Sequence, residues 1–268
     1  ETSHSDEEKV LEVRDSLRIE LKEFSIPNTT IRALEVLNDS TVWFGGSNGR
    51  WGYTMDNGKS WTVDSLKQDD KKLEIRSISV LENGDVFLVG VAEPAVVMNS
   101  KDNGKSWQAV YQDTSKAAFF DAIEFWDAQN GMLLGDAQNG CFHIALTNDG
   151  GNTWTKVACG NIPRALDFEG PFAASNTNIA IKGNNAWFGT GGKTLSRVFS
   201  TANQGKSWRA TNTPIVSGQQ MTGIFSIDFY DENVGIVAGG NWEDVSEKDS
   251  ALAFTTDGGI NWSLIEPN

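Results

Sequence analysis

One eight-residue pattern, Ser/Thr-x-Asp-x-Gly-x-x-Trp, occurs five times and constrains the fold more than any other feature. The acid stands at positions 56, 102, 149 and 257, with Asn at 203, so the intervals are 46, 47, 54 and 54 residues. That period is the length of one four-stranded β-propeller blade. The sequence therefore predicts an all-β propeller with five visible blades, whose repeats are TMDNGKSW at 54–61, SKDNGKSW at 100–107, TNDGGNTW at 147–154, TANQGKSW at 201–208 and TTDGGINW at 255–262.

Each copy of this pattern, here called the Asp box, predicts a self-supporting turn. Asp and Ser/Thr side chains can bond nearby backbone groups, and Gly lowers the steric cost of a positive φ angle. The closing Trp begins the next strand and can pack between neighbouring sheets. Because the same residues recur in every blade, we interpret them as structural rather than as catalytic carboxylates or calcium ligands. They are Asp56, Asp102, Asp149, Asn203 and Asp257, with Trp61, Trp107, Trp154, Trp208 and Trp262.

The rest of each repeat predicts three further strands. The innermost are expected at 31–37, 75–81, 120–126, 176–182 and 224–230, which are rich in β-branched and aromatic residues. We expect a flexible tail at 1–15 and one propeller domain at 16–268, with blades at about 28–66, 74–113, 118–160, 175–212 and 222–268. The segment SLRIELKEFSI at 16–26 predicts one more strand, which would pair with C-terminal strands and close the ring.

The charge balance disfavours several classes of partner. The 268 residues include 22 Lys and Arg against 36 Asp and Glu, a net charge of -14. Nucleic acids and anionic membrane surfaces should therefore be repelled, although acidity also serves solubility. No run of eighteen apolar residues is present that could span a membrane. We expect a monomer. We also expect no cofactor, because the sequence shows no dinucleotide fingerprint, flavin motif or metal cluster.

The two cysteines, Cys141 and Cys159, lie nine residues on either side of Gly150. The third Asp box would fold them toward each other as a cross-strand pair, close enough for a disulfide. The alternative is a pair of buried thiols that act as small apolar side chains. The disulfide, which we favour, implies an oxidising compartment. We expect no metal site, because two Cys with the nearby His143 lack zinc-ligand spacing.

Three stretches resemble secreted bacterial propellers built from BNR or Asp-box repeats. They are GGSNGRWGYTMDNGKSW at 45–61, FAASNTNIAIKG at 172–183 and GQQMTGIFSIDFYDE at 218–232. The resemblance covers residues 28–265 and is to the photosystem II assembly-factor type and, more loosely, to sortilin-like propellers. It implies a secreted or periplasmic protein and usually seven blades, so the five boxes fit either a compact five-bladed ring or an incomplete seven-bladed one. Some relatives carry an oxidoreductase label, which no motif in this sequence supports.

The aligned inner strands suggest a binding rim at the mouth of the central channel. Their second positions hold Arg32, Arg76 and Asp121 in consecutive blades. Two adjacent arginines could grip a carboxylate or phosphate in bidentate fashion. Alternatively, the three side chains form an Arg–Asp network that staples the blades, which we favour. Around the same rim we place Arg50, Arg197, Gln219 and Gln220, near the long loops at 159–175 and 212–222.

An enzymatic alternative is a glycoside hydrolase, because Asp boxes also occur in sialidases. The sialidase arginine motif is not matched here: SIPN at 25–28 lacks the arginine, and NIPR at 161–164 has the wrong order. Another hydrolase needs only two carboxylates across a cleft, and Asp136 with Glu169 is the pair to test. Fold analogy cannot supply that geometry. The sequence favours a secreted or periplasmic, non-catalytic propeller that binds a protein, peptide or glycan, with cell-surface anchoring through a removed N-terminus as a further possibility.

Overall fold

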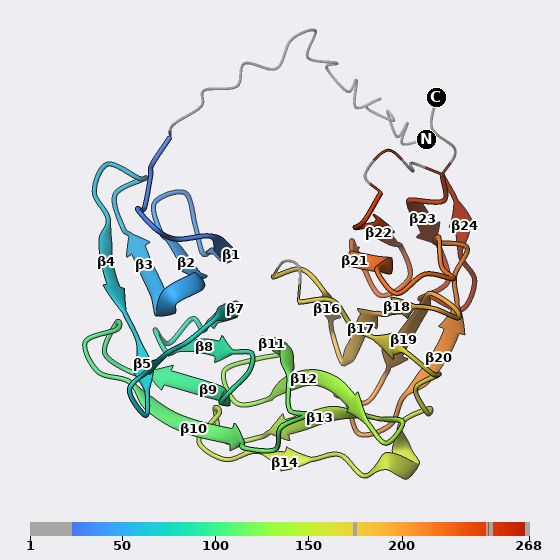
Figure 1. Ribbon diagram of the computed structural model, residues 1–268, viewed down its shortest axis with the longest axis horizontal. Coiled ribbons are helices and arrows are strands. Elements are labelled where there is room, and N and C mark those ends of the chain that lie inside the picture. Colours follow the sequence, from blue (N-terminus) through green and yellow to red (C-terminus); the bar gives the residue numbers. More distant parts are fainter. Residues whose placement is uncertain (1–22, 174–175, 245, 247–248, 266–268) are drawn as a thin grey trace, which may run out of the picture.

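The computed structural model describes residues 23–173, 176–244, 246 and 249–265, which form five four-stranded antiparallel blades along an arc (Figure 1). Each blade runs from an inner strand near the centre of the arc to an outer strand at its rim. The predicted fold class is confirmed. Within the described ranges the helices are two 3-10 turns, Ser47–Gly49 and Cys159–Asn161, and no helix there has the length and apolar character needed to cross a membrane.

The strand bounds follow the repeats closely. Blade 1 comprises β1 (Ile31–Val36), β2 (Val42–Gly46), β3 (Arg50–Thr54) and β4 (Thr62–Ser65). Blade 2 comprises β7 (Ile75–Val80), β8 (Val86–Gly90), β9 (Ala95–Ser100) and β10 (Gln108–Asp113), and blade 3 comprises β11 (Phe120–Phe125), β12 (Gly131–Gln138), β13 (Cys141–Thr147) and β14 (Thr155–Lys156). Blade 4 comprises β16 (Ile179–Lys182), β17 (Asn185–Gly189), β19 (Arg197–Thr201) and β20 (Arg209–Asn212), and blade 5 comprises β21 (Thr222–Phe229), β22 (Gly235–Asn241), β23 (Leu252–Thr255) and β24 (Ser263–Leu264).

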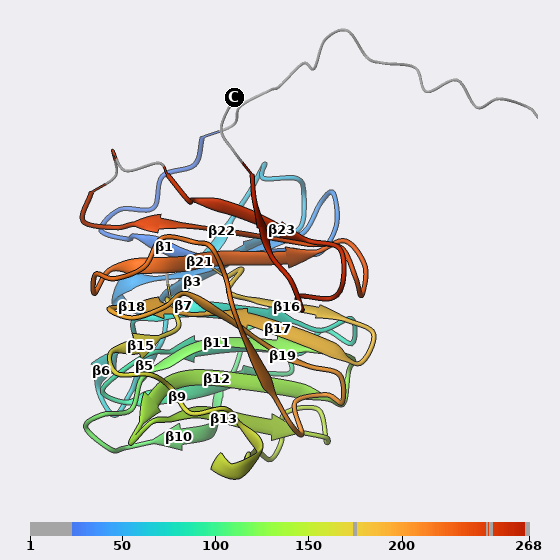
Figure 2. The same cartoon turned by 90° about the vertical axis from the view of Figure 1, so that its right-hand side faces the viewer.

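Two pairs of short strands lie outside the four-stranded blades, on one face of the arc. β5 (Lys67–Gln68) and β6 (Lys71–Lys72) form a hairpin, and β15 (Glu169–Gly170) and β18 (Gly191–Gly192) extend the blade 5 sheet beyond β21. Figure 2 shows all four at the left edge, which we call the loop-rich face. The Asp-box turns join third to fourth strands and so lie at the opposite edge. The additions therefore build up the face on which the sequence places the binding rim.

The core is divided among the contacts between successive blades. In the described residues four apolar clusters join blades 1 and 2, 2 and 3, 3 and 4, and 4 and 5. Trp43, Phe87, Met132 and Trp187 are at most 2% exposed at these contacts. Each such side chain contributes roughly 1.5–3 kcal/mol by leaving water. Packing between neighbouring blades therefore holds the arc together.

The Asp boxes form the hydrogen-bonded turns that their residue types suggest. In the first box the Asp56 carboxylate accepts bonds from Thr54 Oγ1 (2.9 Å) and from Ser60 N and Oγ (2.9 and 2.6 Å), while Gly58 N donates to Thr54 Oγ1. The other boxes repeat these contacts, with Asn203 Oδ1 in place of the acid in the fourth. Hydrogen bonds from Ser60 hold the pKa of Asp56 at about 2. Both oxygens of each of these carboxylates therefore accept hydrogen bonds within the same turn.

One sequence expectation differs from the observed chain path. Residues 23–26, the described part of the strand expected at 16–26, are not in a strand. The remainder of that segment and the expected tail at 1–15 lie outside the described residues. Phe24 instead stacks on Trp61, with ring centroids 5.2 Å apart. This contact covers the Trp of the first Asp box.

Candidate binding site at the channel mouth

The inner strands share a β-bulge at the channel mouth. The pairing register shifts between Ile31 and Ala33 in β1, and at the equivalent place in β7, β11 and β21. A bulge leaves one residue out of the ladder and re-aims its side chain. The bulged residues are Arg32, Arg76, Asp121 and Phe225. Four blades thus carry a bulged residue at the equivalent place of the inner strand.

Three of these residues line a cup on the loop-rich face. Its volume is about 220 Å³, and its lining consists of Arg32, Arg76, Phe172, Ala173, Met221, Phe225 and Trp242. The rings of Phe172 and Phe225 meet edge to face with centroids 5.0 Å apart. Trp242 follows β22 and is 58% exposed, while its backbone N–H donates to Met221 O at 2.9 Å. The cup therefore combines two guanidinium groups with an aromatic wall.

Both arginines keep unused hydrogen-bonding capacity. The Nε atoms of Arg32 and Arg76 are buried and have no hydrogen-bond partner among the described residues. Arg76 makes only a loose ion pair, with 4.0 Å from its Nε to Glu74 Oε1. A buried donor without a partner costs free energy. Both arginines line the cup, where a carboxylate or phosphate could accept hydrogen bonds from their guanidinium groups.

Asp121 does not staple the arginines to blade 3. Neither of its carboxylate oxygens has a hydrogen-bond partner in the described part of the chain, and no ion pair is recorded there between Asp121 and either arginine. Burial raises its pKa well above the ordinary value, and the charge of Asp136 raises it further, while Arg76 opposes both effects. The Arg–Asp network favoured from the sequence is therefore not formed in this structure.

The side chain of Asn176 is hydrogen-bonded to the inner strands of two other blades. Asn176 Oδ1 accepts bonds from Ser77 Oγ (2.9 Å) and Ile78 N (2.8 Å), and its Nδ2 donates to Ile78 O (2.8 Å) and Glu35 Oε2 (3.2 Å). A residue that precedes blade 4 is thus bonded to blades 1 and 2. Burial raises the pKa of Glu35 to about 7, although the Asn176 bond lowers it in part. These bonds join three blades through their inner strands or the residues just before them.

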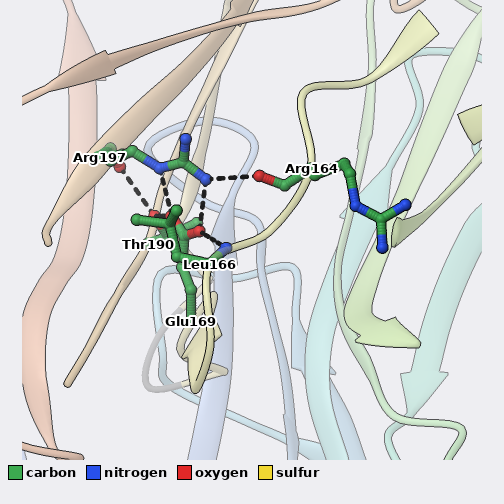
Figure 3. A network of polar contacts seen from close by, with 5 residues as sticks. All are labelled: Arg164, Leu166, Glu169, Thr190 and Arg197. Carbon is green, nitrogen blue, oxygen red and sulfur yellow. Dashed lines mark hydrogen bonds and ion pairs between the residues drawn. The ribbon is translucent and has the colours of Figure 1, made fainter. Parts of the chain in front are cut away.

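Glu169, one of the two proposed catalytic carboxylates, is already used by the protein (Figure 3). Its Oε1 accepts bonds from Arg197 Nε (2.8 Å) and Thr190 Oγ1 (2.7 Å), and its Oε2 accepts from Arg197 Nη2 and from Leu166 N (2.7 Å). Arg197 Nη2 also donates to Arg164 O. This bidentate, buried pair anchors the 159–175 loop to β19. Arg197, expected on the rim, is 9% exposed and is committed to this contact.

Asp136, the other proposed catalytic carboxylate, lies beside the same loop. A Cβ placed on Gly170 would be 3.0 Å from Asp136 Oδ1, so the two chain segments are neighbours. Burial raises the pKa of Asp136 to about 6. Its intended partner Glu169, however, is turned to Arg197. The structure therefore brings the two segments together without presenting two free carboxylates.

Cys141 and Cys159 are joined by a disulfide, with a Cα–Cα distance of 5.7 Å. The bond ties the start of the 159–175 loop to β13, and the Glu169–Arg197 pair ties its end to blade 4. Phe172 and Ala173, which line the cup, follow the second anchor by three and four residues. Both anchors therefore lie on the N-terminal side of the loop's contribution to the site. In the described ranges no three His, Cys, Asp or Glu side chains converge as metal ligands.

The remaining predicted rim residues lie outside the cup. Arg50 begins β3 and pairs with Ser65, and Gln219 and Gln220 are exposed beside Met221. The residues that sequence reasoning missed are Phe172, Ala173, Met221, Trp242 and Asn176. Four of these five belong to the two long loops or the strand start after them, so loop length was the available signal. Nothing in the sequence singled out Trp242.

Comparisons with known proteins agree with this architecture. A family model described as photosynthesis system II assembly factor YCF48 matches residues 19–116, and a BNR/Asp-box repeat model matches residues 253–264. The resemblance to BNR propellers of the photosystem II assembly-factor type is confirmed. No curated protein matches the sequence.

Three solved structures illustrate the shared fold. YCF48 bound to D1 peptide has a TM-score of 0.58 at 17% identity, over 88% of this chain and 68% of that chain. The GH74 xyloglucanase from Xanthomonas campestris has a TM-score of 0.60 at 14% identity, over 87% of this chain and 38% of the xyloglucanase. YCF48 from Cyanidioschyzon merolae has a TM-score of 0.51 at 13% identity, over 90% and 87% of the two chains. At these identities the similarity concerns the fold.

Proposed function

We propose that the protein is a non-catalytic binding propeller that captures a peptide segment of a protein partner in the channel-mouth cup. The observation that carries the proposal is that Arg32 and Arg76 from neighbouring blades both line the cup. The ligand group that suits them is a carboxylate, because guanidinium groups bind carboxylates bidentately. The Phe172–Phe225 wall and Trp242 would receive an apolar side chain beside it.

One further point supports a peptide. One solved structure of similar fold is that of YCF48 with a D1 peptide. The net charge of -14 repels acidic partners at a distance, so recognition depends on the local positive charge of the cup.

The test is a binding screen with a displayed peptide library, followed by titration calorimetry with the selected peptides. The double variant Arg32→Gln/Arg76→Gln should lower affinity by about tenfold to hundredfold, as expected for the loss of charge-assisted hydrogen bonds. Arg50→Gln is the matched control, because Arg50 starts a strand in blade 1 but does not line the cup. Equal affinity of the double variant and the control would refute the site.

The glycoside hydrolase alternative has one supporting observation, the fold shared with a GH74 xyloglucanase. Against it stands Glu169, whose carboxylate oxygens accept four hydrogen bonds within the protein. Incubating the protein with xyloglucan and other oligosaccharides, with mass spectrometry of the products, separates the two functions. Cleavage that is lost in Asp136→Asn would favour the hydrolase.

We also propose a secreted or periplasmic location. The Cys141–Cys159 disulfide supports it, since structural disulfides persist in oxidising compartments. Thiol alkylation of the protein in its native cells, before any lysis, would test this. Extensive labelling of both cysteines would contradict the proposal.

A further inference from the structure

Six asparagines of the chain are followed directly by glycine. They are Asn48, Asn57, Asn83, Asn103, Asn130 and Asn139. In such a pair the glycine nitrogen can attack the side-chain amide of the asparagine, and glycine favours the attack because it has no Cβ to crowd it. The attacking nitrogen must first give up its proton. The hydrogen bonding of each glycine N–H in the folded protein therefore decides which of the six pairs can react.

In five of the six pairs the fold engages or buries the glycine N–H. Four of these groups donate hydrogen bonds, namely Gly49 N to Leu73 O (2.5 Å), Gly58 N to Thr54 Oγ1 (3.0 Å), Gly84 N to Leu81 O (2.9 Å) and Gly104 N to Ser100 Oγ (2.8 Å). Gly131 is buried within β12, where it pairs with Phe125 of β11 and Thr147 of β13. The folded protein therefore protects these five pairs.

The Asn139–Gly140 pair is different. It forms the turn between β12 and β13, and the Gly140 N–H has no acceptor among the described residues. Asn139 is exposed, so water reaches it. Its φ angle of 55° is close to the 61° of Asn57 and the 57° of Asn103. Hydrogen bonding, rather than backbone conformation, therefore separates Asn139 from those two residues.

The guanidinium of Arg164 lies against this same peptide unit. Its Nη2 donates to Asn139 O at 2.9 Å, and a Cβ placed on Gly140 would be 2.7 Å from that nitrogen. Ala165 N donates to Gly140 O at 3.0 Å, which keeps this segment beside the turn. When Gly140 N loses its proton, amide resonance shares the negative charge with Asn139 O. A charge-assisted hydrogen bond to that oxygen stabilises the attacking anion.

We propose that Asn139 is a site of spontaneous deamidation, with the Arg164 guanidinium stabilising the attacking nitrogen of Gly140. The bond from Gly140 N to Asn139 Cγ forms, the Cγ–Nδ2 bond breaks, and Nδ2 leaves as ammonia while the Gly140 proton passes to solvent and is replaced on the leaving group. Water then opens the cyclic imide at either carbonyl, which leaves aspartate or isoaspartate at position 139. The new carboxylate lies beside Arg164 in a groove of about 650 Å³ that Phe168 also lines. The modification therefore adds one negative charge to the loop-rich face.

Peptide mapping by mass spectrometry over time measures the reaction at each pair in the folded protein, and enzymatic methylation detects isoaspartate. Asn139 should react about tenfold faster than any of the other five, and Arg164→Gln should slow it by about fivefold to tenfold. Arg209→Gln is the matched control and should leave the rate at Asn139 unchanged, because Arg209 Nη2 also donates to a backbone carbonyl, Gly258 O, at 3.1 Å. In urea all six pairs should react at similar rates, since each asparagine precedes glycine.

Two results would overturn the proposal. One is a rate at Asn139 in the folded protein that does not exceed the rates of the other pairs, which would mean that the free N–H does not control the reaction. The other is an Arg164→Gln variant in which Asn139 reacts as fast or faster, which would mean that the guanidinium only holds the turn rigid. Circular dichroism establishes that the variant is folded. If it is not, the comparison among the six pairs of the unsubstituted protein still decides.

Discussion

The Asp-box turns and the channel are both rich in polar side chains, but the two regions differ in the hydrogen bonding and in the pKa values of their carboxyl groups. In the turns, hydrogen bonds from Ser60, Ser106 and Asn261 hold the pKa values of Asp56, Asp102 and Asp257 at about 2. In the channel, burial raises the pKa of neighbouring carboxyls, and several polar atoms have no partner among the described residues. The Asp-box carboxylates and the Glu169–Arg197 pair are hydrogen-bonded within the protein and hold the fold, whereas the Nε atoms of Arg32 and Arg76 have no partner among the described residues.

The largest expected change in stability concerns a polar pair that is hydrogen-bonded within the protein. Glu169→Ala leaves the buried guanidinium of Arg197 without its carboxylate partner, which should cost about 3–5 kcal/mol of unfolding free energy. Urea denaturation measures the change. Glu243→Ala, at an exposed residue, is the control and should stay within about 0.5 kcal/mol. A loss below about 1 kcal/mol for Glu169→Ala would show that the pair does not anchor the loop.

The second-largest expected effect is a gain in stability, and its size depends on pH. Burial, with the charge of Glu35, raises the pKa of Glu124 to about 8. Ionisation then favours the unfolded state, so stability falls as pH rises from the unfolded pKa near 4.5 through the folded pKa. Glu124→Gln mimics the protonated acid and should raise Tm by about 5 °C at pH 8.5, with little change at pH 4.5. Thermal melts at the two pH values give the comparison, and a gain of equal size at both would contradict the assigned cause.

A smaller effect is expected in the turns. Asp102→Ala should lower Tm by about 2–4 °C, because the bonds from Ser100 and Ser106 are lost. Asp102→Asn should retain most of the stability at pH 7, since Asn203 makes the corresponding bonds in blade 4. The depressed pKa of Asp102 adds stability above its ordinary range that is lost as pH falls toward 2. Differential scanning calorimetry should therefore show the Tm values of Asp102→Ala and the unsubstituted protein converging as the pH falls.

The smallest effect on stability is expected at the cup. Arg32→Gln/Arg76→Gln removes two guanidinium groups whose Nε atoms have no hydrogen-bond partner in the described part of the chain. The unfolding free energy should therefore change by no more than about 0.5 kcal/mol, while the peptide affinity falls as described above. Chemical denaturation checks the first quantity. A large loss of stability would show that these arginines, like Glu169, stabilise the fold.

Much of the fold was predictable because its signals are local. An Asp box needs only residues within eight positions to form its bonds, and its recurrence gave the blade period. The aligned inner strands also placed Arg32 and Arg76 at one level of the channel, and both line the observed cup. Loop length pointed to the segments that supply Phe172 and Met221.

The errors arose where a side chain chooses a partner far away in sequence. Glu169 was expected to face Asp136 as a catalytic carboxylate, but it pairs with Arg197, 28 residues further along. Asp121 was expected to bind the neighbouring arginines, but it is buried without a hydrogen-bond partner in the described residues. Asn176 bonds to Ile78, 98 residues away, and no motif indicates this. Such contacts join segments that come together only when the blades are assembled.

By itself the sequence determined the turns, the strand order and the blade repeat, because these depend on hydrogen bonds and periodicities within about 50 residues. Only the tertiary structure decided which polar groups of the channel find partners and which apolar side chains at the ends of the arc stay exposed. The physical reason is that burial and pairing are properties of the assembled blades. The same inner-strand position is a packed Ile78 in one blade and an exposed Leu34 in another.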